Sequence, residues 1–132
     1  MALEQHKDAA EFVTQNSLNE HLGAFFDPQI RYLTILDKNH VIGFMLIALD
    51  EDKKSVELRR IVVETKDSGV GQMAMRLLEG YVKDEIGRSR IWLDVFTNNE
   101  RAKYIYQKLG YIQFGMAEYA DGRPLLLFEK DI

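Results

Sequence analysis

The alternation of apolar and polar residues divides the chain into strands and helices. Alternating or continuous apolar runs bounded by turn residues predict strands, whereas apolar residues three and four positions apart predict helices. The predicted strands cover residues 31–36, 40–49, 55–63, 91–96, 111–118 and 124–130. The predicted helices cover residues 2–15, 16–26, 70–86 and 99–109.

Turn residues mark the ends of these elements. The turn at 37–39 joins the first two strands as a hairpin, and Asp121-Gly122 joins the last two. Gly87 and Gly110 follow the helices at 70–86 and 99–109, where a left-handed residue commonly ends a helix. Hairpins at both ends and a strand-helix-strand unit between them predict an α/β (α+β) fold. Its mixed, mostly antiparallel sheet would be flanked by helices in one domain, residues 1–132.

The composition is that of a globular protein. Hydrophobic residues make up 46% and charged residues 29% of the chain, which argues against disorder. The longest apolar run, Val41 to Leu49, is too short to cross a bilayer, so no membrane partner is expected. The first residues lack the basic and apolar segments of a secretory signal, which favours a cytoplasmic protein. The net charge of -4 disfavours nucleic-acid binding.

Two kinds of site are excluded by residue type and spacing. The chain has no cysteine, so neither disulfides nor thiolate catalysis is expected. The three histidines, His6, His21 and His40, show no metal-ligand spacing, so no metal site is expected.

A glycine-containing loop precedes the helix at 70–86. Gly69 and Gly71 leave backbone N–H groups accessible at a helix N-terminus, where the helix dipole favours an anion such as a pyrophosphate. The alternative is a simple strand-to-helix turn. The same residues also satisfy the dinucleotide pattern GxGxxA with Asp94 downstream. In that fold the glycines directly follow the strand, whereas residues 64–68 intervene here.

Two segments of the chain carry residues at characteristic spacings. The first is the strand ending at Val63 with the loop Lys66-x-x-Gly69-x-Gly71, and the second contains Val95, Asn99, Ala102, Tyr106 and Gly110-Tyr111. They resemble two motifs of the GNAT superfamily of acetyl-CoA-dependent N-acetyltransferases, Arg/Gln-x-x-Gly-x-Gly/Ala and Val-Asn-Ala-Tyr-Gly-Phe, with Lys66 in place of Arg or Gln and tyrosine in place of phenylalanine. Both motifs occur in the family's order and spacing.

The resemblance implies that acetyl-CoA is the acetyl donor. A sheet bulge after Arg60 would expose the strand backbone, which would then pair with the pantetheine arm of acetyl-CoA. The glycine loop would hold its pyrophosphate. Asn99 would either bind the pantetheine or cap its helix. The implied cofactor-binding residues are Ile61, Val62, Val63, Lys66, Asp67, Ser68, Gly69, Val70, Gly71, Gln72, Asn99 and Tyr106.

Acetyl transfer to an amine also requires proton transfer, because an ammonium with a pKa near 10.4 must lose a proton. Glu57 is the candidate base, since strand alternation places it on the same face as Ile61 and Val63. The alternative is a plain ion pair with Arg59. In the family that the chain resembles, the tyrosine at the position of Tyr106 points at the thioester sulfur, so Tyr106 is the candidate acid. A phenol near pKa 10 could protonate a thiolate near 8.5 at a cost of about 2 kcal/mol. The alternative for Tyr106 is packing.

The sequence therefore predicts an acetyl-CoA-dependent N-acetyltransferase that acts through a direct ternary complex, without a metal. Its acceptor would be a primary amine on a protein N-terminus, a lysine or a small molecule, and the protein a monomer or homodimer. The family's first strand is not evident before the helix at 2–15. Phe25 and Phe26, just before the first hairpin, are expected to line the acceptor pocket. A silent CoA-binding module and a dinucleotide-binding oxidoreductase are the alternatives.

Overall fold

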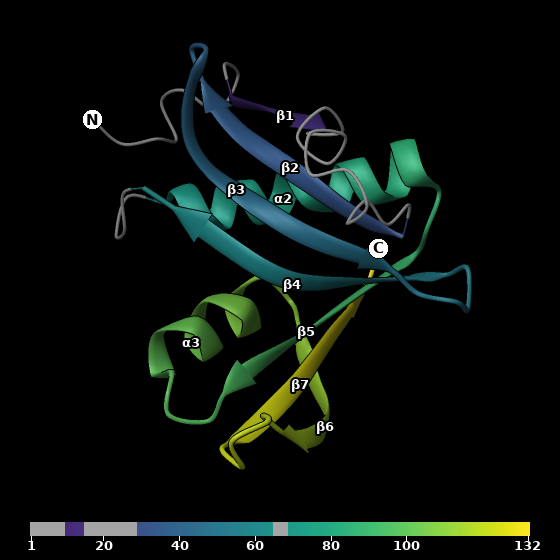
Figure 1. The fold of residues 1–132 in the computed structure, drawn as a ribbon, viewed down its shortest axis with the longest axis vertical. Coiled ribbons are helices and arrows are strands. Elements are labelled where there is room, and N and C mark those ends of the chain that lie inside the picture. Colours follow the sequence, from purple (N-terminus) through teal and green to yellow (C-terminus); the bar gives the residue numbers. More distant parts are fainter. Residues whose placement is uncertain (1–9, 15–28, 65–68) are drawn as a thin grey trace.

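The computed structural model describes residues 10–14, 29–64 and 69–132 (Figure 1). These residues form one seven-stranded sheet in the order β1-β2-β3-β4-β5-β7-β6. The strands are β1 (Ala10–Thr14), β2 (Ile30–Asp37), β3 (His40–Leu49), β4 (Ser55–Val63), β5 (Arg90–Phe96), β6 (Ile112–Glu118) and β7 (Pro124–Asp131). The helices are α2 (Val70–Tyr81), η3 (Val82–Ile86) and α3 (Glu100–Lys108).

All neighbouring strands are antiparallel except β4 and β5, which are parallel. A parallel pair needs a crossover connection, and here α2 and η3 provide it. The predicted mixed, mostly antiparallel sheet with a strand-helix-strand unit at its centre is therefore confirmed.

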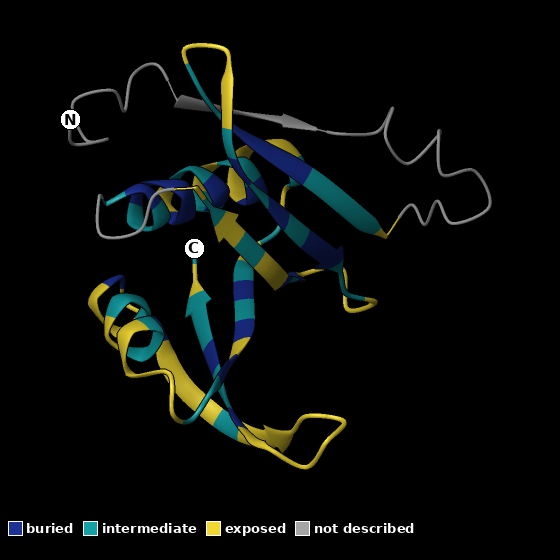
Figure 2. Cartoon of the chain, turned by 60° about the vertical axis from the view of Figure 1, so that its left-hand side comes forward, coloured by how far each residue is buried: buried dark blue, intermediate teal, exposed yellow. Residues whose placement is uncertain are grey.

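The core lies between α2 and the central strands (Figures 1 and 2). Strands that bury one face alternate between core and surface residues, and the helix contributes side chains three and four positions apart. The core residues include Leu33, Ile35, Met45, Ile47, Val56, Leu58, Met75, Leu78, Ile91 and Leu93. This packing fixes β4, α2 and β5 relative to one another.

Most predicted elements are found close to their predicted ends. β3 and β4 have the predicted bounds, and the helix predicted at 70–86 is continuous but changes from α to π geometry at Val82. Gly87, with φ 76°, closes it: its N–H donates to Val82 O, as does the N–H of Arg88 at 3.0 Å. The left-handed glycine end predicted for this helix is confirmed.

The prediction of a helix over residues 2–15 is wrong for its last residues. Ala10–Thr14 is a strand that pairs antiparallel with β2, from Ala10 opposite Asp37 to Thr14 opposite Leu33. The segment contains Phe, Val and Thr in succession, which favour strands, and the open edge of β2 supplies hydrogen-bond partners. The first strand that the sequence did not reveal is therefore present.

Several predictions fall on residues outside the described ranges. These are the helix at 16–26 with Phe25 and Phe26, and the loop residues Lys66, Asp67 and Ser68. Among the helices that are described, none is long and apolar enough to span a membrane.

A one-residue bulge in β4 controls the geometry of the site. Leu58 pairs with Ile47 and Arg60 pairs with Leu46, so Arg59 is an extra residue on β4. The family resemblance predicts a bulge after Arg60, and in the structure the extra residue is Arg59. An extra residue bends its strand and changes the alternation of side chains between the two sheet faces.

Candidate active site

β4 and β5 separate beyond the bulge and leave a gap in the sheet. Their parallel pairing extends only from Ser55 opposite Arg90 to Leu58 opposite Leu93. Beyond these pairs, β4 continues beside β3 alone and β5 continues beside β7 alone. The sheet is therefore splayed, as Figure 1 shows in the diverging paths of β4 and β5. A splayed pair leaves one backbone edge of each strand without a strand partner.

The β4 edge that faces this gap belongs to Ile61 and Val63. Glu64 N–H donates to Ile42 O on β3 at 2.7 Å. Since backbone groups alternate between the two sides of a strand, Val62 also faces β3, whereas Ile61 and Val63 face away from it. The predicted exposure of strand backbone is thus found for Ile61 and Val63. Val62 lies in the same strand but lines no cavity of the site.

The N-terminus of α2 lies at the end of this gap. Gly69 is its N-cap and has φ 80°, a conformation that favours glycine, and no side chain of the described residues caps the helix. Met73 N–H donates to Gly69 O at 3.0 Å, so the N–H groups of residues 70–72 precede the helical ladder. No acidic residue lies in the first turn. These features suit an anion.

In the described part of the chain, neither packing nor backbone conformation requires a glycine at position 71. A Cβ built at this position meets no heavy atom within 4 Å, and its φ is not positive. Gly43 differs, because a Cβ there would collide with the backbone oxygen of Val62. Gly71 therefore keeps open a space beside the helix N-terminus, into which a ligand can approach the backbone.

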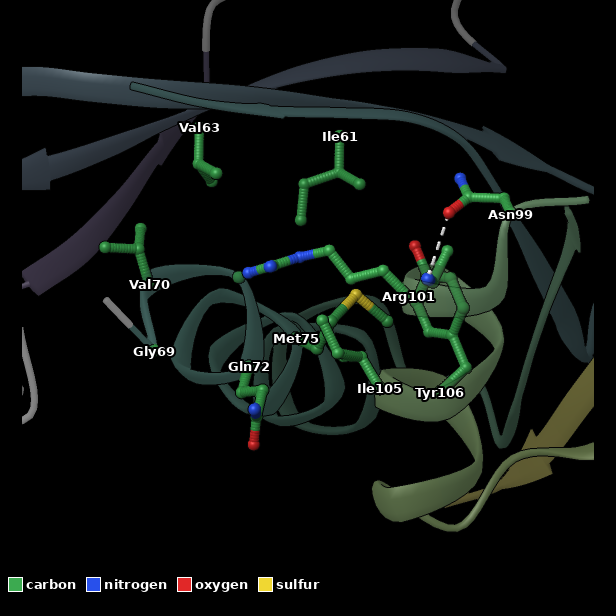
Figure 3. A pocket seen from close by; sticks show the side chains of 12 residues that line it. Ile61, Val63, Gly69, Val70, Gln72, Met75, Asn99, Arg101, Ile105 and Tyr106 are labelled. Atoms are coloured by element: carbon green, nitrogen blue, oxygen red, sulfur yellow. Dashed lines mark hydrogen bonds between the residues drawn. The ribbon is translucent and has the colours of Figure 1, made fainter. Parts of the chain in front are cut away.

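A cavity of about 340 Å³ connects these features. It is lined by the β4 edge, by the first turns of α2 and by one face of α3, as seen in Figure 3. Its residues are Ile61, Val63, Gly69, Val70, Gly71, Gln72, Met75, Asn99, Arg101, Ala102, Ile105 and Tyr106. The described residues that sequence analysis assigned to the cofactor, Val62 excepted, all lie here.

A second cavity of about 330 Å³ lies between the diverging ends of β4 and β5. It shares part of its lining with the first cavity, and the shared residues are Ile61, Asn99, Ala102 and Tyr106. The two cavities therefore adjoin at these residues, Tyr106 among them, and together they are called the cleft. Such an arrangement allows two ligands to meet beside one side chain.

Asn99 caps α3. Its side-chain oxygen accepts a hydrogen bond from Ala102 N–H at 3.1 Å. Sequence analysis left open whether Asn99 caps its helix or binds a ligand, and the structure establishes the cap. Asn99 also lines both cavities.

Tyr106 comes from α3 with its hydroxyl directed towards the strand that carries Ile61 (Figure 3). Burial and, to a smaller extent, the carboxylate of Asp94 raise the pKa of Tyr106 to about 12. The ring of Tyr106 packs edge-on against Tyr111, with 5.9 Å between ring centroids. Tyr111 in turn donates to Glu79 at 3.1 Å. The phenol therefore stays protonated near neutral pH and its ring is held in place.

Asp94 is a site residue that sequence analysis considered only as part of a dinucleotide pattern. It follows the last β4–β5 pair, so it lies where the gap opens, and it lines the second cavity with Tyr106. Partial burial raises the pKa of Asp94, although the residue as a whole is exposed. The sequence feature that could have identified Asp94 as a site residue is its position near the end of the strand that precedes the helix capped by Asn99.

Glu57 does not have the position that strand alternation predicted. Leu58 and Ile61 pair with Ile47 and Met45, which share a sheet face, so Glu57 lies on the opposite face from Ile61. The bulge at Arg59 is the reason for this correction. Glu57 lines neither cavity and accepts a hydrogen bond from Arg59 Nε at 3.0 Å. This ion pair is the alternative considered above, and a catalytic role for Glu57 stays an untested prediction.

Comparison with known proteins places these features in a family. A sequence model of the Acetyltransferase (GNAT) family matches residues 2–111. The uncharacterized N-acetyltransferase YdgE of Bacillus subtilis (strain 168) is 41% identical over 46 residues, which span 35% of this chain and 29% of YdgE.

Solved structures of acetyltransferases share the fold. Spermidine/spermine N-acetyltransferase SpeG from Vibrio cholerae, in complex with manganese ions, superposes with a TM-score of 0.71 at 18% identity, over 89% of this chain and 72% of SpeG. The microcin C7 self-immunity acetyltransferase MccE, in complex with acetyl-CoA and AMP, gives a TM-score of 0.67 at 17% identity, over 79% of this chain and 62% of MccE.

Proposed function

Because this chain belongs to the GNAT family of acetyltransferases, we propose that it transfers the acetyl group of acetyl-CoA to a primary amine. The observation that carries the proposal is the splayed gap, in which an unpaired edge of β4 leads to the uncapped N-terminus of α2. An extended pantetheine arm would add to that edge as a strand does, and a pyrophosphate would accept the α2 N–H groups.

The cleft fits such a donor at both ends. Gly71 leaves room for a phosphate at the helix, and a donor that follows the shared wall towards the second cavity would have its thioester end beside Tyr106. When bound, acetyl-CoA supplies the carbonyl carbon that the amine attacks and the thiolate that departs. The amine would enter from the second cavity. The chain has no cysteine that could form a thioester intermediate, and we propose direct transfer within a ternary complex.

Asp94 would accept the proton that the amine loses. It lies in the cavity assigned to the amine. Because its pKa is raised, the pKa of Asp94 lies closer to that of an ammonium than the pKa of an ordinary carboxyl does. A carboxylate there also attracts the cationic form of the amine. Glu57 is a weaker candidate, because its carboxylate is paired with Arg59 and lines neither cavity.

Tyr106 would donate a hydrogen bond to the sulfur as negative charge develops there. With a phenol pKa of about 12, complete proton transfer to a thiolate of ordinary pKa 8.5 is uphill by about 5 kcal/mol. This exceeds the cost expected from an unperturbed phenol. We therefore assign Tyr106 the role of a donor that stabilises the thiolate, with solvent completing its protonation.

Replacing Tyr106 with phenylalanine tests this role. The Tyr106→Phe variant keeps the ring that packs on Tyr111 and loses only the hydroxyl. We expect kcat to fall by about 10- to 100-fold, the worth of one hydrogen bond to a charged group, while the affinity for acetyl-CoA stays near that of the wild type. Steady-state kinetics combined with acetyl-CoA titration measure both. Equal losses in kcat and affinity would assign Tyr106 to binding or packing instead.

The activity itself is tested by release of the CoA thiol from acetyl-CoA in the presence of candidate amines. The panel contains polyamines, because SpeG is named as a spermidine/spermine N-acetyltransferase, together with peptides bearing free N-termini and aminoglycosides. We expect thiol release that depends on both acetyl-CoA and one amine class. Stabilisation by acetyl-CoA without thiol release in the presence of any amine would instead indicate a silent CoA-binding module.

Binding of NADH that acetyl-CoA does not displace would favour the alternative of a dinucleotide-binding oxidoreductase. A monomeric or homodimeric state stays a prediction.

A further inference from the structure

The second cavity carries charges of both signs. The charged side chains that line it are Asp94 from β5 and Arg59 and Arg60 from β4. Arg59 Nε donates to Glu57 at 3.0 Å, so the charge of Arg59 is compensated. Among the described residues, no salt bridge involves Arg60 or Asp94. Within that part of the chain, the cavity therefore presents one carboxylate and one guanidinium that are not paired with an opposite charge.

The strand register places Arg60 and Asp94 on the same face of the sheet. The β3 partners of Glu57 and Arg60 are two residues apart, so these two β4 residues share a face. Glu57 lies opposite Trp92 on β5, and Asp94 follows Trp92 by two residues, so Asp94 also points to this face. The core residues of β4 and β5 that pack with α2 point to the other face. Arg60 and Asp94 thus border the gap from its two sides.

Arg60 has a contact of its own but keeps donors for an anion. Its guanidinium carbon lies 5.9 Å from the centroid of the Phe44 ring. A ring face attracts the cation but supplies no carboxylate oxygen. The planar, paired N–H donors of a guanidinium match the two oxygens of a carboxylate. A ligand that fits both sides of the gap would therefore carry a cation for Asp94 and a carboxylate for Arg60.

We propose that the acceptor is a primary amine that also bears a carboxylate, with its nitrogen beside Asp94 and its carboxylate bound by Arg60. This inference rests on the proposed function and names the chemical class of the acceptor. The carboxylate takes no part in the bond changes: the nitrogen bonds to the acetyl carbon, the C–S bond breaks, and the amine proton passes to Asp94. Small amino acids and peptides with an acidic residue beside their N-terminus share this chemistry. A polyamine would instead place a second cation near Arg60, where like charges repel.

Matched acceptors test the charge that Arg60 recognises. The compounds γ-aminobutyrate, butylamine and putrescine share a carbon chain and differ in its far end, which is a carboxylate, a methyl group or a second amine. Glycine and β-alanine vary the spacing between the two charges, and peptides with Glu, Gln or Lys as second residue form the other arm. For the wild type we expect kcat/KM of CoA-thiol release to be about tenfold higher for the best carboxylate acceptor than for its neutral counterpart. The cationic acceptor should have the lowest kcat/KM.

Three variants identify the residue responsible. Arg60→Gln removes the charge and Arg60→Glu reverses it, whereas Arg76→Gln removes the charge of an exposed arginine on α2 that lines neither cavity. We expect the ratio of kcat/KM for the carboxylate and neutral acceptors to fall close to one in Arg60→Gln. Arg60→Glu should prefer the cationic acceptor, and Arg76→Gln should keep the wild-type ratio. Because each ratio compares acceptors on one protein preparation, partial unfolding of a variant does not alter it.

The acceptor preference of the wild type decides the inference. A preference for the carboxylate in the small compounds alone identifies a small amino acid as the acceptor, and a preference in the peptides alone identifies a polypeptide. Equal kcat/KM for all acceptors, a preference for the cationic ones, or an unchanged ratio in Arg60→Gln overturns the inference. Absence of thiol release with every amine would instead refute the proposed function.

Discussion

Replacing Gly71 with glutamate is expected to abolish the stabilisation of this protein by acetyl-CoA. The new carboxylate would occupy the space beside the α2 N–H groups and repel the pyrophosphate that is proposed to bind there. In the wild type, acetyl-CoA at about 100 times its Kd should add about 2.7 kcal/mol of stability, a shift in Tm on the order of 10 °C. Differential scanning fluorimetry with and without acetyl-CoA measures the difference.

The same substitution should leave the fold intact. A Cβ at Gly71 meets nothing within 4 Å, and an acidic residue in the first turn of a helix is favourable. Replacing glycine with a better helix former also gains up to about 1 kcal/mol. The Tm without ligand should therefore match or exceed that of the wild type, which separates a binding defect from unfolding.

Gly80→Glu is the matched control for Gly71→Glu. Gly80 is an exposed glycine of the same helix, a Cβ there also meets nothing within 4 Å, and the position lines neither cavity. The variant introduces the same charge outside the cleft, so its response to acetyl-CoA should equal that of the wild type. If Gly71→Glu retains a full acetyl-CoA response, the pyrophosphate does not bind at this helix N-terminus.

The strands were predictable wherever one face of a strand is buried. β3 alternates between more and less buried residues, β4 does so on either side of its bulge, and both strands have their predicted ends. β1 was not predictable in the same way, because its strand conformation accompanies pairing with β2, a segment elsewhere in the sequence. The helices ending at Gly87 and Gly110 were predictable because a positive φ, 76° and 96° here, is a local requirement.

The site was predictable only where its chemistry is local. Gly69, Gly71 and Asn99 act through backbone conformation or a helix end, and each lies where the motifs placed it. Glu57 was misplaced because one inserted residue at Arg59 reverses the alternation, and a bulge has no clear signature in this sequence. Arg101 also lines the larger cavity and was not predicted, because its place there depends on where α3 lies relative to the rest of the fold.

This failure at Glu57 makes the identity of the base the decisive question for the mechanism. Two carboxylates lie on neighbouring strands: Asp94 opens into the second cavity, whereas Glu57 is held by Arg59 outside it. Asp94→Asn is therefore expected to lower kcat/KM for the acceptor by roughly 10²- to 10⁴-fold, the range for loss of a general base. The amide is isosteric, so the variant should fold and should bind acetyl-CoA as the wild type does.

The pH dependence of kcat/KM gives an independent test of Asp94. Because burial raises the pKa of this carboxyl, its basic form is present only above the raised value, and activity should fall as the pH drops through it. In the pH profile of Asp94→Asn, the fall in kcat/KM that is due to protonation of Asp94, the acidic limb, should disappear. The part of the profile that is set by ionisation of the amine, the amine limb, should remain. Glu57→Gln breaks an ion pair with an exposed arginine, worth at most about 1 kcal/mol, and should keep both limbs. If Glu57→Gln instead removes the acidic limb while Asp94→Asn retains it, the base is Glu57, as strand alternation first suggested.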